Sequence, residues 1–503
     1  MHTRFSLIAF CAAAAACLGE RGPFTNRMAQ SGTSYLARAA RQPVRWQPWG
    51  RDAFALAAKL DRPVLLYIGS DACRWCAETD RAIYTDPEIG ALINALFVPI
   101  RVDRDERPDV ALRYQAAVER LAGLHGWPLT VFLTSDGAPF FGGTYFPADD
   151  PITGRGLKQL LPEVAKSYRD QRSFIVQQAA VLQQLVLTGN GDSHGVLRPA
   201  LVQQGIVAVA RELDEAVRTH AALGSVMHAA ATSLLFGDHD TTAVRALNLM
   251  LDTTAGALGE DPPRLVRAAL AGSLAKAWAV TGEPRYRETG RTLVRSLVRE
   301  LPEEEGSIFA DREAYVIEHV IVAAMTFGER GVESRARAAL DALLQRTYAH
   351  GWGVRHVIAA RITPQGLLQD QVQVASACLA AYQLSKEQRY LDVALDLAAI
   401  VERGYADPLG GYYDVATPPG EALPPPTSLP ALGDRTKDVF DDVLPGANPA
   451  AALLLAHLAR VTGDQSYRRR AQTTLEAFAG AMNGVGVRAA TFLAAARETL
   501  ATP

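Results

Sequence analysis

The sequence predicts two folds in series: an α/β domain, then an all-α domain of helical hairpins that close into an (α/α) toroid. Between residues 26 and 150, short apolar runs alternate with amphipathic helical stripes. From about residue 157 the strand signals fade, and three later stretches repeat one another. The length of 503 residues also requires two or three domains, because single hydrophobic cores stop growing well below that size.

The first domain is predicted to order its strands and helices along the chain as follows. PVLLYIG (63–69) is a buried strand, and DPEIGALINAL (86–96) is a helix opened by Asp-Pro. FVPIRVD (97–103) is a second strand, and a helix covers roughly 109–122. LTVFLTSDGAPFFGGTYF (129–146) reads as two strands around an Asp-Gly turn. This order predicts a sheet with helices on both faces.

The second domain is predicted from the repeats at 274–297, 379–401 and 455–478. Each repeat is an apolar helix, a short polar turn, a tyrosine and a second helix. The tyrosines are Tyr286, Tyr390 and Tyr467. Because isolated helical hairpins cannot bury their apolar faces, we expect them to stack into a solenoid or a closed toroid. We place the domains at 26–187 and 196–500.

The net charge argues against nucleic-acid binding, and the N-terminus indicates where the protein acts. The net charge is −3, so no basic field indicates nucleic acid. The start, MHTRFSLIAFCAAAAACLGE (1–20), has a cationic residue, a compact apolar run and small residues, typical of a secretory signal. Cys17 ends a run that resembles a lipobox and is a candidate lipidation site. The alternatives are a non-lipidated signal, or an N-terminal extension of a cytoplasmic protein. No stretch is apolar for about 18 residues, so no membrane span is expected.

The cysteines of YIGSDACRWCAETD (67–80) carry the main functional signal. Zinc normally takes four ligands, and no second CxxC or His pair lies near Cys73 and Cys76 in the sequence, so we expect no metal and no cofactor. Their place at a strand–helix junction favours redox chemistry instead. Cys73 at a helix N-terminus would be the nucleophile and Cys76 would resolve a mixed disulfide. Arg74 adds positive charge that lowers the pKa of Cys73.

Cys378, inside an apolar helical pattern, is predicted to be a buried core thiol.

A thioredoxin-like site also needs a cis-proline facing the CxxC. GLHGWPLT (123–130) supplies Pro128, after Trp127 and before a strand. His125 either faces the sulfurs as a proton acceptor or is a solvent-facing loop residue. Asp71 is predicted to be the helix N-cap. Thioredoxins keep a buried carboxylate six residues before the first cysteine, and here Tyr67 occupies that position.

Four segments of the first domain resemble the spermatogenesis-associated protein 20-like family: 26–54, YIGSDACRWC (67–76), 84–110 with VDRDERPD, and 126–147 with GGTYFP. The resemblance implies an α/β thioredoxin-like domain fused to a six-hairpin-glycosidase-like (α/α) toroid, with a redox role inferred from the fold.

The chain departs from the family in two places. Arg74 and Ala77 stand where the family usually has histidines, in the pattern CHWCH. The Gly-Phe-Gly and Pro-Lys-Phe-Pro strings are absent from 214–236, and the His-Phe-Glu-Lys-Met segment is absent near 261–278. The chain is also shorter than typical members.

Three readings of function follow. The first is an exported, periplasmic thiol–disulfide oxidoreductase whose partners are protein thiols and disulfides. The second is a protein that binds or processes a sugar in the toroid cavity, which requires paired carboxylates. The third is a catalytically silent binding scaffold. Aspartates available to the second reading are Asp370, Asp407, Asp414, Asp441 and Asp442, of which Asp407 reads as a turn residue and Asp441 and Asp442 as helix caps.

Overall fold

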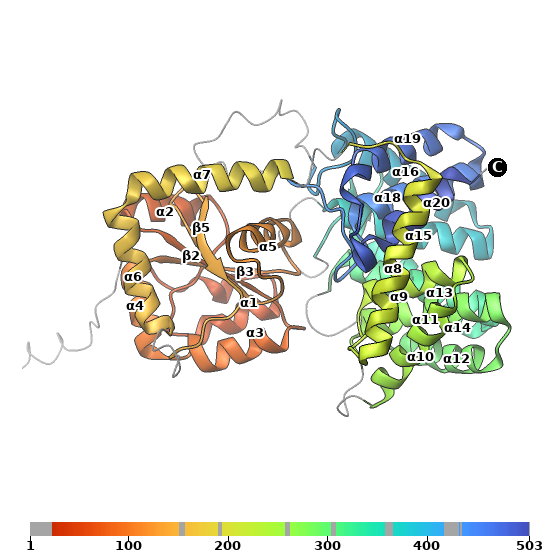
Figure 1. The fold of residues 1–503 in the computed structure, drawn as a ribbon, viewed down its shortest axis with the longest axis horizontal. Coiled ribbons are helices and arrows are strands. Elements are labelled where there is room, and N and C mark those ends of the chain that lie inside the picture. Colours follow the sequence, from red (N-terminus) through yellow and green to blue (C-terminus); the bar gives the residue numbers. More distant parts are fainter. Residues whose placement is uncertain are drawn as a thin grey trace, which may run out of the picture. The chain divides into compact units, whose positions relative to one another are not determined.

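The chain folds into two compact units, each described by itself (Figure 1). The computed structural model describes residues 23–149, 156–189, 194–256, 262–302, 308–357, 366–416, 432 and 435–501. The first unit contains the described residues of 1–107, 114–183 and 428–432. The second contains those of 108–113, 184–427 and 433–503. The candidate lipidation residue Cys17 and the predicted signal at 1–20 lie outside the described residues.

The first unit is built on a mixed five-stranded sheet with the order β1-β3-β2-β4-β5. The strands are β1 (Gln47–Pro48), β2 (Val64–Gly69), β3 (Val98–Asp103), β4 (Leu129–Leu133) and β5 (Pro139–Gly143). β3 runs parallel to both β1 and β2, whereas β4 pairs antiparallel with β2 and with β5. The central strands β2, β3 and β4 are buried along their whole length, as expected for apolar runs between helical layers.

The helices of this unit follow local sequence signals. Asp86 caps α4 with its side chain, accepting from the backbone N–H groups of Glu88 and Ile89, and Pro87 fills the first helical position. The strands and helices predicted for this domain are all present, and β4 and β5 form the predicted hairpin around the Asp-Gly turn. The helices that lie wholly in the unit are α1 (Ser34–Arg38), α2 (Arg51–Leu60), α3 (Arg74–Thr79), the π-helical turn Asp80–Tyr84, α4 (Pro87–Leu96) and α6 (Leu157–Asp170). Most of α5 (Pro108–Ala122) and of α7 (Arg172–Gly189) also belongs to it.

The second unit is a closed ring of helical hairpins. The inner helices are α9 (Val226–Gly237), α11 (Arg264–Thr281), α13 (Ala310–Phe327), α15 (Leu368–Ser385), α18 (Ala447–Thr462) and α20 (Ala490–Leu500). Each packs on the next, and α20 packs back on α9, so the ring closes. The outer helices are α8 (Pro199–Thr219), α10 (Thr241–Gly256), α12 (Pro284–Leu297), α14 (Arg330–Thr347), α16 (Gln388–Gly404) and α19 (Gln465–Glu476). The predicted (α/α) toroid is confirmed.

The repeated turn between paired helices has a backbone cause. Gly282 ends α11 and Gly463 ends α18, both in the left-handed conformation with φ +67° and +77°. Glycine adopts this conformation without steric cost, which explains the Thr-Gly-acid pattern in two repeats. The third repeat places Lys386 in the same conformation, with φ +60°. Cys378 lies buried in α15, as predicted.

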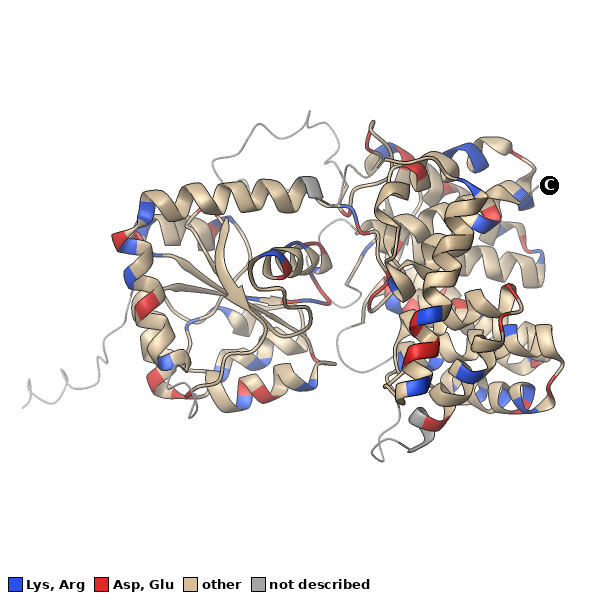
Figure 2. Ribbon diagram, in the orientation of Figure 1, with Lys and Arg blue, Asp and Glu red and all other residues tan. Residues whose placement is uncertain are grey.

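Charge is mixed over both units. Figure 2 shows Lys and Arg interspersed with Asp and Glu along the helices. Within the described residues, no helix is both long and apolar enough to cross a membrane.

Candidate functional site

The predicted redox residues are positioned by the carboxyl end of the central strand β2. Gly69, its last residue, pairs in parallel register with Asp103, the last residue of β3. On the other side, Ile68 pairs with Leu129, so Pro128 lies next to the end of β2. The Trp127–Pro128 peptide bond is cis. The sheet thus brings the start of the CxxC segment, a buried acid and the cis-proline to one edge.

Cys73 and Cys76 form a disulfide at the start of α3. Cys73 is the N-cap: its sulfur accepts a hydrogen bond from the backbone N–H of Cys76, with Sγ–N 3.1 Å. Cys76 is fully buried, whereas Cys73 is partly exposed. The outer sulfur is therefore the accessible one and the inner sulfur the protected one.

The prediction that Asp71 caps the helix is wrong. Cys73 takes the extended N-cap conformation, so the helix begins at Arg74 and lies out of reach of the Asp71 side chain. The Asp71 carboxylate instead accepts a hydrogen bond from Ser34 Oγ and pairs with Arg38.

The remaining predicted residues lie around this edge in different settings. Arg74 is exposed, and its charge, after that of Arg81, lowers the pKa of Glu78. His125 is exposed, with its Nδ1 3.9 Å from a carboxylate oxygen of Glu119. Trp127 lies under the guanidinium of Arg104, 5.2 Å from its carbon to the ring centre.

An aromatic pair stands next to the accessible cysteine. Trp75 is 62% exposed and its ring centre lies 6.3 Å from that of Tyr145, which is 41% exposed. Exposed large aromatics beside an accessible sulfur offer apolar contact area to a protein or peptide. Sequence reasoning did not identify this pair.

A buried cation lies in the same domain, which sequence reasoning also missed. Arg101, on β3, is 1% exposed and makes two hydrogen bonds to the carboxylate of Asp80, with N–O distances of 2.7 and 2.6 Å. Its guanidinium carbon lies 4.2 Å from the ring centre of Tyr35 and 5.0 Å from that of Tyr67. An arginine inside the apolar run FVPIRVD is the sequence signal that could have indicated this cluster.

Two groups stand near the position of the missing thioredoxin carboxylate. The Tyr67 hydroxyl donates to the backbone carbonyl of Cys76, at 3.4 Å. Asp103 is buried and accepts from the backbone N–H of Asp105 at 2.9 Å. Burial, reinforced by the negative charge of Asp105, raises the pKa of Asp103 to about 7. The edge therefore has a buried acid with a pKa near neutrality, on the strand beside the one that carries the carboxylate in thioredoxins.

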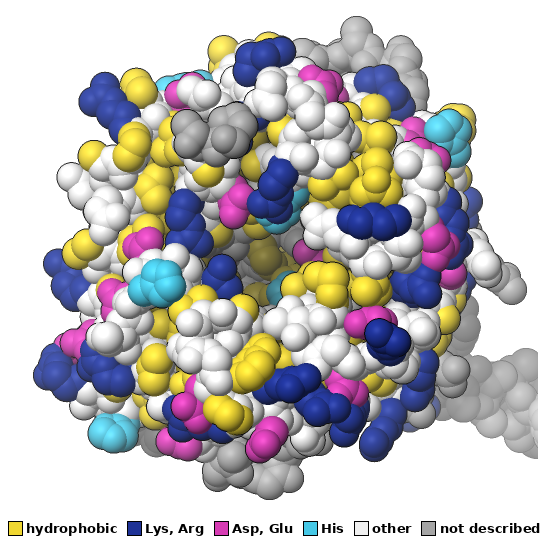
Figure 3. All heavy atoms as spheres, turned by 90° about the vertical axis from the view of Figure 1, so that its right-hand side faces the viewer, with side chains coloured by type: hydrophobic (Ala, Val, Ile, Leu, Met, Phe, Trp, Pro, Cys, Tyr) yellow, Lys and Arg dark blue, Asp and Glu magenta, His cyan; other side chains and the backbone are white. Residues whose placement is uncertain are grey.

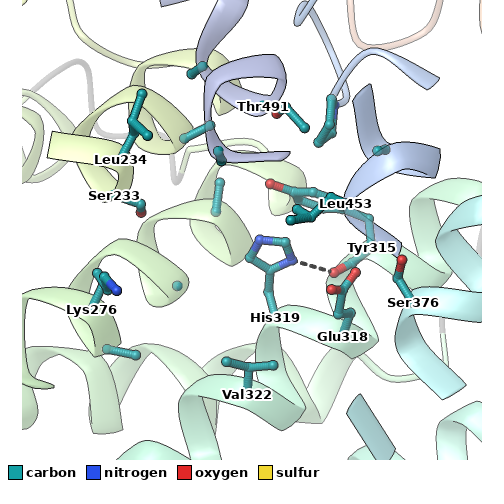
Figure 4. A pocket seen from close by; sticks show the side chains of 18 of the residues that line it. Ser233, Leu234, Lys276, Tyr315, Glu318, His319, Val322, Ser376, Leu453 and Thr491 are labelled. Carbon is teal, nitrogen blue, oxygen red and sulfur yellow. Dashed lines mark hydrogen bonds between the residues drawn. The ribbon is translucent and has the colours of Figure 1, made fainter. Parts of the chain in front are cut away.

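The toroid contains a second candidate site, a cavity of about 420 Å³ lined mainly by small side chains. Figure 3 shows a hollow near the centre of the toroid face. In Figure 4, Tyr315, Glu318 and His319 of α13 gather at the cavity. His319 Nδ1 hydrogen-bonds to the backbone carbonyl of Tyr315 at 2.9 Å. Burial raises the pKa of Glu318 to about 8 and lowers that of His319 to about 4, so at pH 7 both groups are uncharged.

The five aspartates that the sequence made available to a sugar site do not line this cavity. Asp407 accepts from the backbone of Leu409 and pairs with Lys437, as its reading as a turn residue predicted. Asp441 accepts from the backbone N–H groups of Gly446 and Thr491. These contacts are structural, so the carboxyl in the cavity is Glu318, which sequence reasoning did not select.

A buried group of possible metal ligands lies elsewhere in the toroid, formed by Asp311, His356 and Asp370. His356 Nδ1 is 2.8 Å from the Asp370 carboxylate. Asp370 also accepts from the backbone N–H groups of Leu367 and Asp311. Its carboxylate is thus already hydrogen-bonded to the imidazole and to the backbone at the start of α15.

Fold and site define a thioredoxin-like domain with a CxxC pair, joined to an (α/α) toroid. Residues 25–186 match a family model named Thioredox_DsbH and described as "Protein of unknown function, DUF255". Over this domain the chain is similar to spermatogenesis-associated protein 20, in agreement with the resemblance seen in its sequence. It is 37% identical to spermatogenesis-associated protein 20 of Rattus norvegicus over 152 residues, 30% of this chain and 19% of that protein. It is 36% identical to an uncharacterized protein of Caenorhabditis elegans over 171 residues, 34% of this chain and 24% of that protein.

The chain thus spans about a fifth of the length of the curated relatives it matches. A solved structure of an unsaturated glucuronyl hydrolase specific for heparin superposes with a TM-score of 0.40 and 13% identity, covering 56% of this chain and 85% of that one. At this TM-score the likeness adds nothing to the toroid assignment, which rests on the closed ring of helices.

Proposed function

We propose that the protein is a thiol–disulfide oxidoreductase that acts through Cys73 and Cys76. One observation carries the proposal: the two cysteines form a disulfide at a strand–helix junction, with one sulfur accessible and the other buried. This asymmetry suits a nucleophile and a resolving thiol. The cis-proline at Pro128 and the exposed Trp75–Tyr145 pair give a bound peptide a surface beside Cys73.

In the reducing direction, the thiolate of Cys73 attacks a substrate disulfide. One substrate sulfur leaves as a thiol, and Cys73 is joined to the other in a mixed disulfide. Cys76 then attacks Cys73 and releases the second substrate thiol. In this structure the backbone N–H of Cys76 donates a hydrogen bond to the Cys73 sulfur. The same hydrogen bond stabilises negative charge on that sulfur in the reduced protein.

Trapping the intermediate tests this function. The reduced full-length protein is mixed with a peptide disulfide, quenched with acid and analysed by mass spectrometry. We expect C76S to accumulate the peptide on Cys73, C73S to form no adduct, and C378S, which changes a buried thiol, to behave as wild type. A wild-type protein that exchanges no faster than free cysteine would refute the proposal.

We further propose that the protein acts outside the cytoplasm, where disulfides persist, and that Cys17 is its lipid-anchored residue. Protein thiols and disulfides would be its partners. Subcellular fractionation with metabolic fatty-acid labelling tests both statements. We expect labelling of the wild type and none of C17A, and recovery of the wild type only in the cytoplasm would refute them.

A second candidate function is favoured by the toroid cavity. Glu318 lines it and makes no hydrogen bond or ion pair with another described residue, so its carboxyl is available to a ligand. We propose a small hydroxylated molecule of the sugar class, because the protonated carboxyl, the serine hydroxyls and the side chains of Lys276 and Arg497 offer hydrogen bonds, and the small side chains leave room for a ring. Calorimetry with a monosaccharide panel should show binding that E318Q weakens. No heat with any monosaccharide would exclude this ligand class.

A further inference from the structure

Gly69 shows that two side chains crowd the space above the end of β2. A Cβ added to Gly69 would lie 2.2 Å from the hydroxyl oxygen of Tyr35 and 3.0 Å from the sulfur of Cys76. Only glycine leaves room for both atoms. Tyr35 comes from α1, far from the CxxC in sequence, and its side chain is fully buried. The fold therefore brings a phenol hydroxyl next to the resolving sulfur.

The Tyr35 hydroxyl has no well-formed hydrogen bond with any described group, although it lies beside the Tyr67 hydroxyl. A buried polar group without a partner is costly, and its presence needs a reason. A disulfide sulfur is a weak acceptor, whereas a thiolate is a strong one. The structure holds the disulfide, the state in which this donor has least to bind.

The charged and titratable groups facing Tyr35 are Arg101, Asp80, Asp103 and Tyr67. Burial raises the pKa of Tyr35 far above its ordinary value, and the positive charge of Arg101 offsets this only in part. Tyr35 therefore keeps its proton at every working pH and acts as a hydrogen-bond donor. Arg101 fixes the phenol ring from one face, and the Asp80 carboxylate holds Arg101 in place.

We propose that the Tyr35 hydroxyl donates a hydrogen bond to the Cys76 thiolate in the reduced protein and thereby speeds resolution of the mixed disulfide. The inference rests on the proposed oxidoreductase function and assigns Tyr35 as a catalytic residue of its second step. In that step the thiolate of Cys76 attacks the Cys73 sulfur, and the bond between Cys73 and the substrate sulfur breaks. The Cys73–Cys76 bond forms, so the protein pair is oxidised by two electrons.

The substrate is reduced by the same two electrons and leaves as a thiolate. It takes from solvent a proton equivalent to the one Cys76 released. Tyr35 gives up no proton: its donated bond stabilises the attacking thiolate and so increases the thiolate fraction at neutral pH. The substrate disulfide is the only oxidant required.

Y35F tests the assignment, with Y84F as the matched control. Tyr84 belongs to the same buried aromatic cluster, but its hydroxyl bonds to Thr130. Reduced full-length protein is mixed with cystamine, quenched with acid at intervals, and the Cys73 mixed disulfide is counted by mass spectrometry. We expect Y35F to resolve it about tenfold more slowly than wild type at pH 7, the effect of one hydrogen bond to a charged group. The difference in resolution rate between Y35F and wild type should shrink at high pH, because Cys76 is then a thiolate in both proteins. Y84F should resolve the mixed disulfide at the wild-type rate.

A second measurement separates this inference from the proposed function. In a C73S background, the pKa of Cys76 is read from thiolate absorbance, and Y35F should raise it by about one unit. If wild type forms no mixed disulfide, the oxidoreductase proposal fails while this titration still tests Tyr35. Equal resolution rates and equal Cys76 pKa values in Y35F and wild type would overturn the inference.

If Y35F does not fold, 3-fluorotyrosine at position 35 keeps the ring and strengthens the donor. Resolution should then become faster at pH 7, and an unchanged rate would contradict the assignment.

Discussion

The two units bury charge next to their candidate sites in opposite ways. In the α/β unit, Arg101 is 1% exposed but has a bidentate partner in Asp80 and aromatic rings around its guanidinium. In the toroid, Glu318 faces the cavity with no ionic partner among the described residues. The positive charge of Arg101 is thus neutralised by Asp80 in the folded protein. Glu318 carries no charge at pH 7, because its carboxyl keeps its proton.

The difference shows what each unit has to supply. A paired buried cation stays in one protonation state, so it can orient neighbours such as Tyr35 without responding to pH. An unpaired carboxyl changes its protonation whenever pH or a ligand changes its surroundings. The α/β unit therefore holds a fixed scaffold around the Cys73–Cys76 disulfide, and the toroid holds a carboxyl whose protonation depends on its surroundings.

Removing the partner of the buried cation should have the largest effect. D80A leaves Arg101 charged and uncompensated, and we expect it to lower the free energy of unfolding by about 3–5 kcal/mol. E78A is the matched control, because Glu78 is paired with the exposed Arg81 and lies in the same segment. Exposed pairs contribute little, so E78A should leave the free energy of unfolding nearly unchanged. Chemical denaturation gives both values, and equal losses would contradict the distinction between the two pairs.

Filling the space above Gly69 should have the next largest effect. A methyl group there would lie 2.2 Å from Tyr35 Oη, closer than real contacts come, and 3.0 Å from Cys76 Sγ, which is tight, so G69A should cost about 1–3 kcal/mol. Gly331, in the first turn of α14, has open space at its Cβ position. G331A should stabilise by up to about 1 kcal/mol, since alanine favours the helix. Thermal unfolding checks the pair, and a neutral G69A would show that Tyr35 and Cys76 are not tightly packed.

Sequence reasoning reached further in the α/β unit, because its chemistry is local. Cys73, Cys76 and Pro128 belong to short strings whose residue types and order already indicate a thioredoxin-like fold. Tyr35 could not be found in this way, since only the folded chain brings α1 to the end of β2. The N-cap was missed because an extended Cys73 places the N-cap two residues after Asp71.

The toroid was predictable as an architecture but not as a site. The helical hairpins follow from apolar periodicity and from the glycines that end α11 and α18. Which carboxyl faces the cavity depends on the rotation of each inner helix, and this is set by packing on both neighbours. Aspartates in conspicuous loop motifs, such as Asp407 and Asp441, proved to bond the backbone, whereas Glu318 sits in an ordinary apolar helix.

The smallest predicted effect tests the uncompensated carboxyl, and its sign depends on pH. The pKa of Glu318 is about 8 in the folded protein and 4.5 ordinarily, so the unfolded chain loses its proton first as pH rises. Glu318 therefore destabilises the fold progressively between about pH 4.5 and 8, and not below. E318Q, which does not titrate, should match the wild type at pH 4 and exceed it by about 1–2 kcal/mol at pH 8.

Glu329 provides the opposite case in the same unit, because Arg295, by hydrogen bonding, and then Arg291 lower its pKa. Glu329 therefore stabilises the fold at pH values above its ordinary pKa of 4.5, and this stabilisation is lost as pH falls through its lowered pKa in the folded protein. E329Q should destabilise the protein by about 1 kcal/mol at pH 8 and by less in acid. Denaturation curves at the two pH values compare the variants directly. If E318Q lost stability at pH 8 as E329Q does, Glu318 would have to be charged and paired, and the contrast between a balanced charge in one unit and an avoided charge in the other would no longer hold.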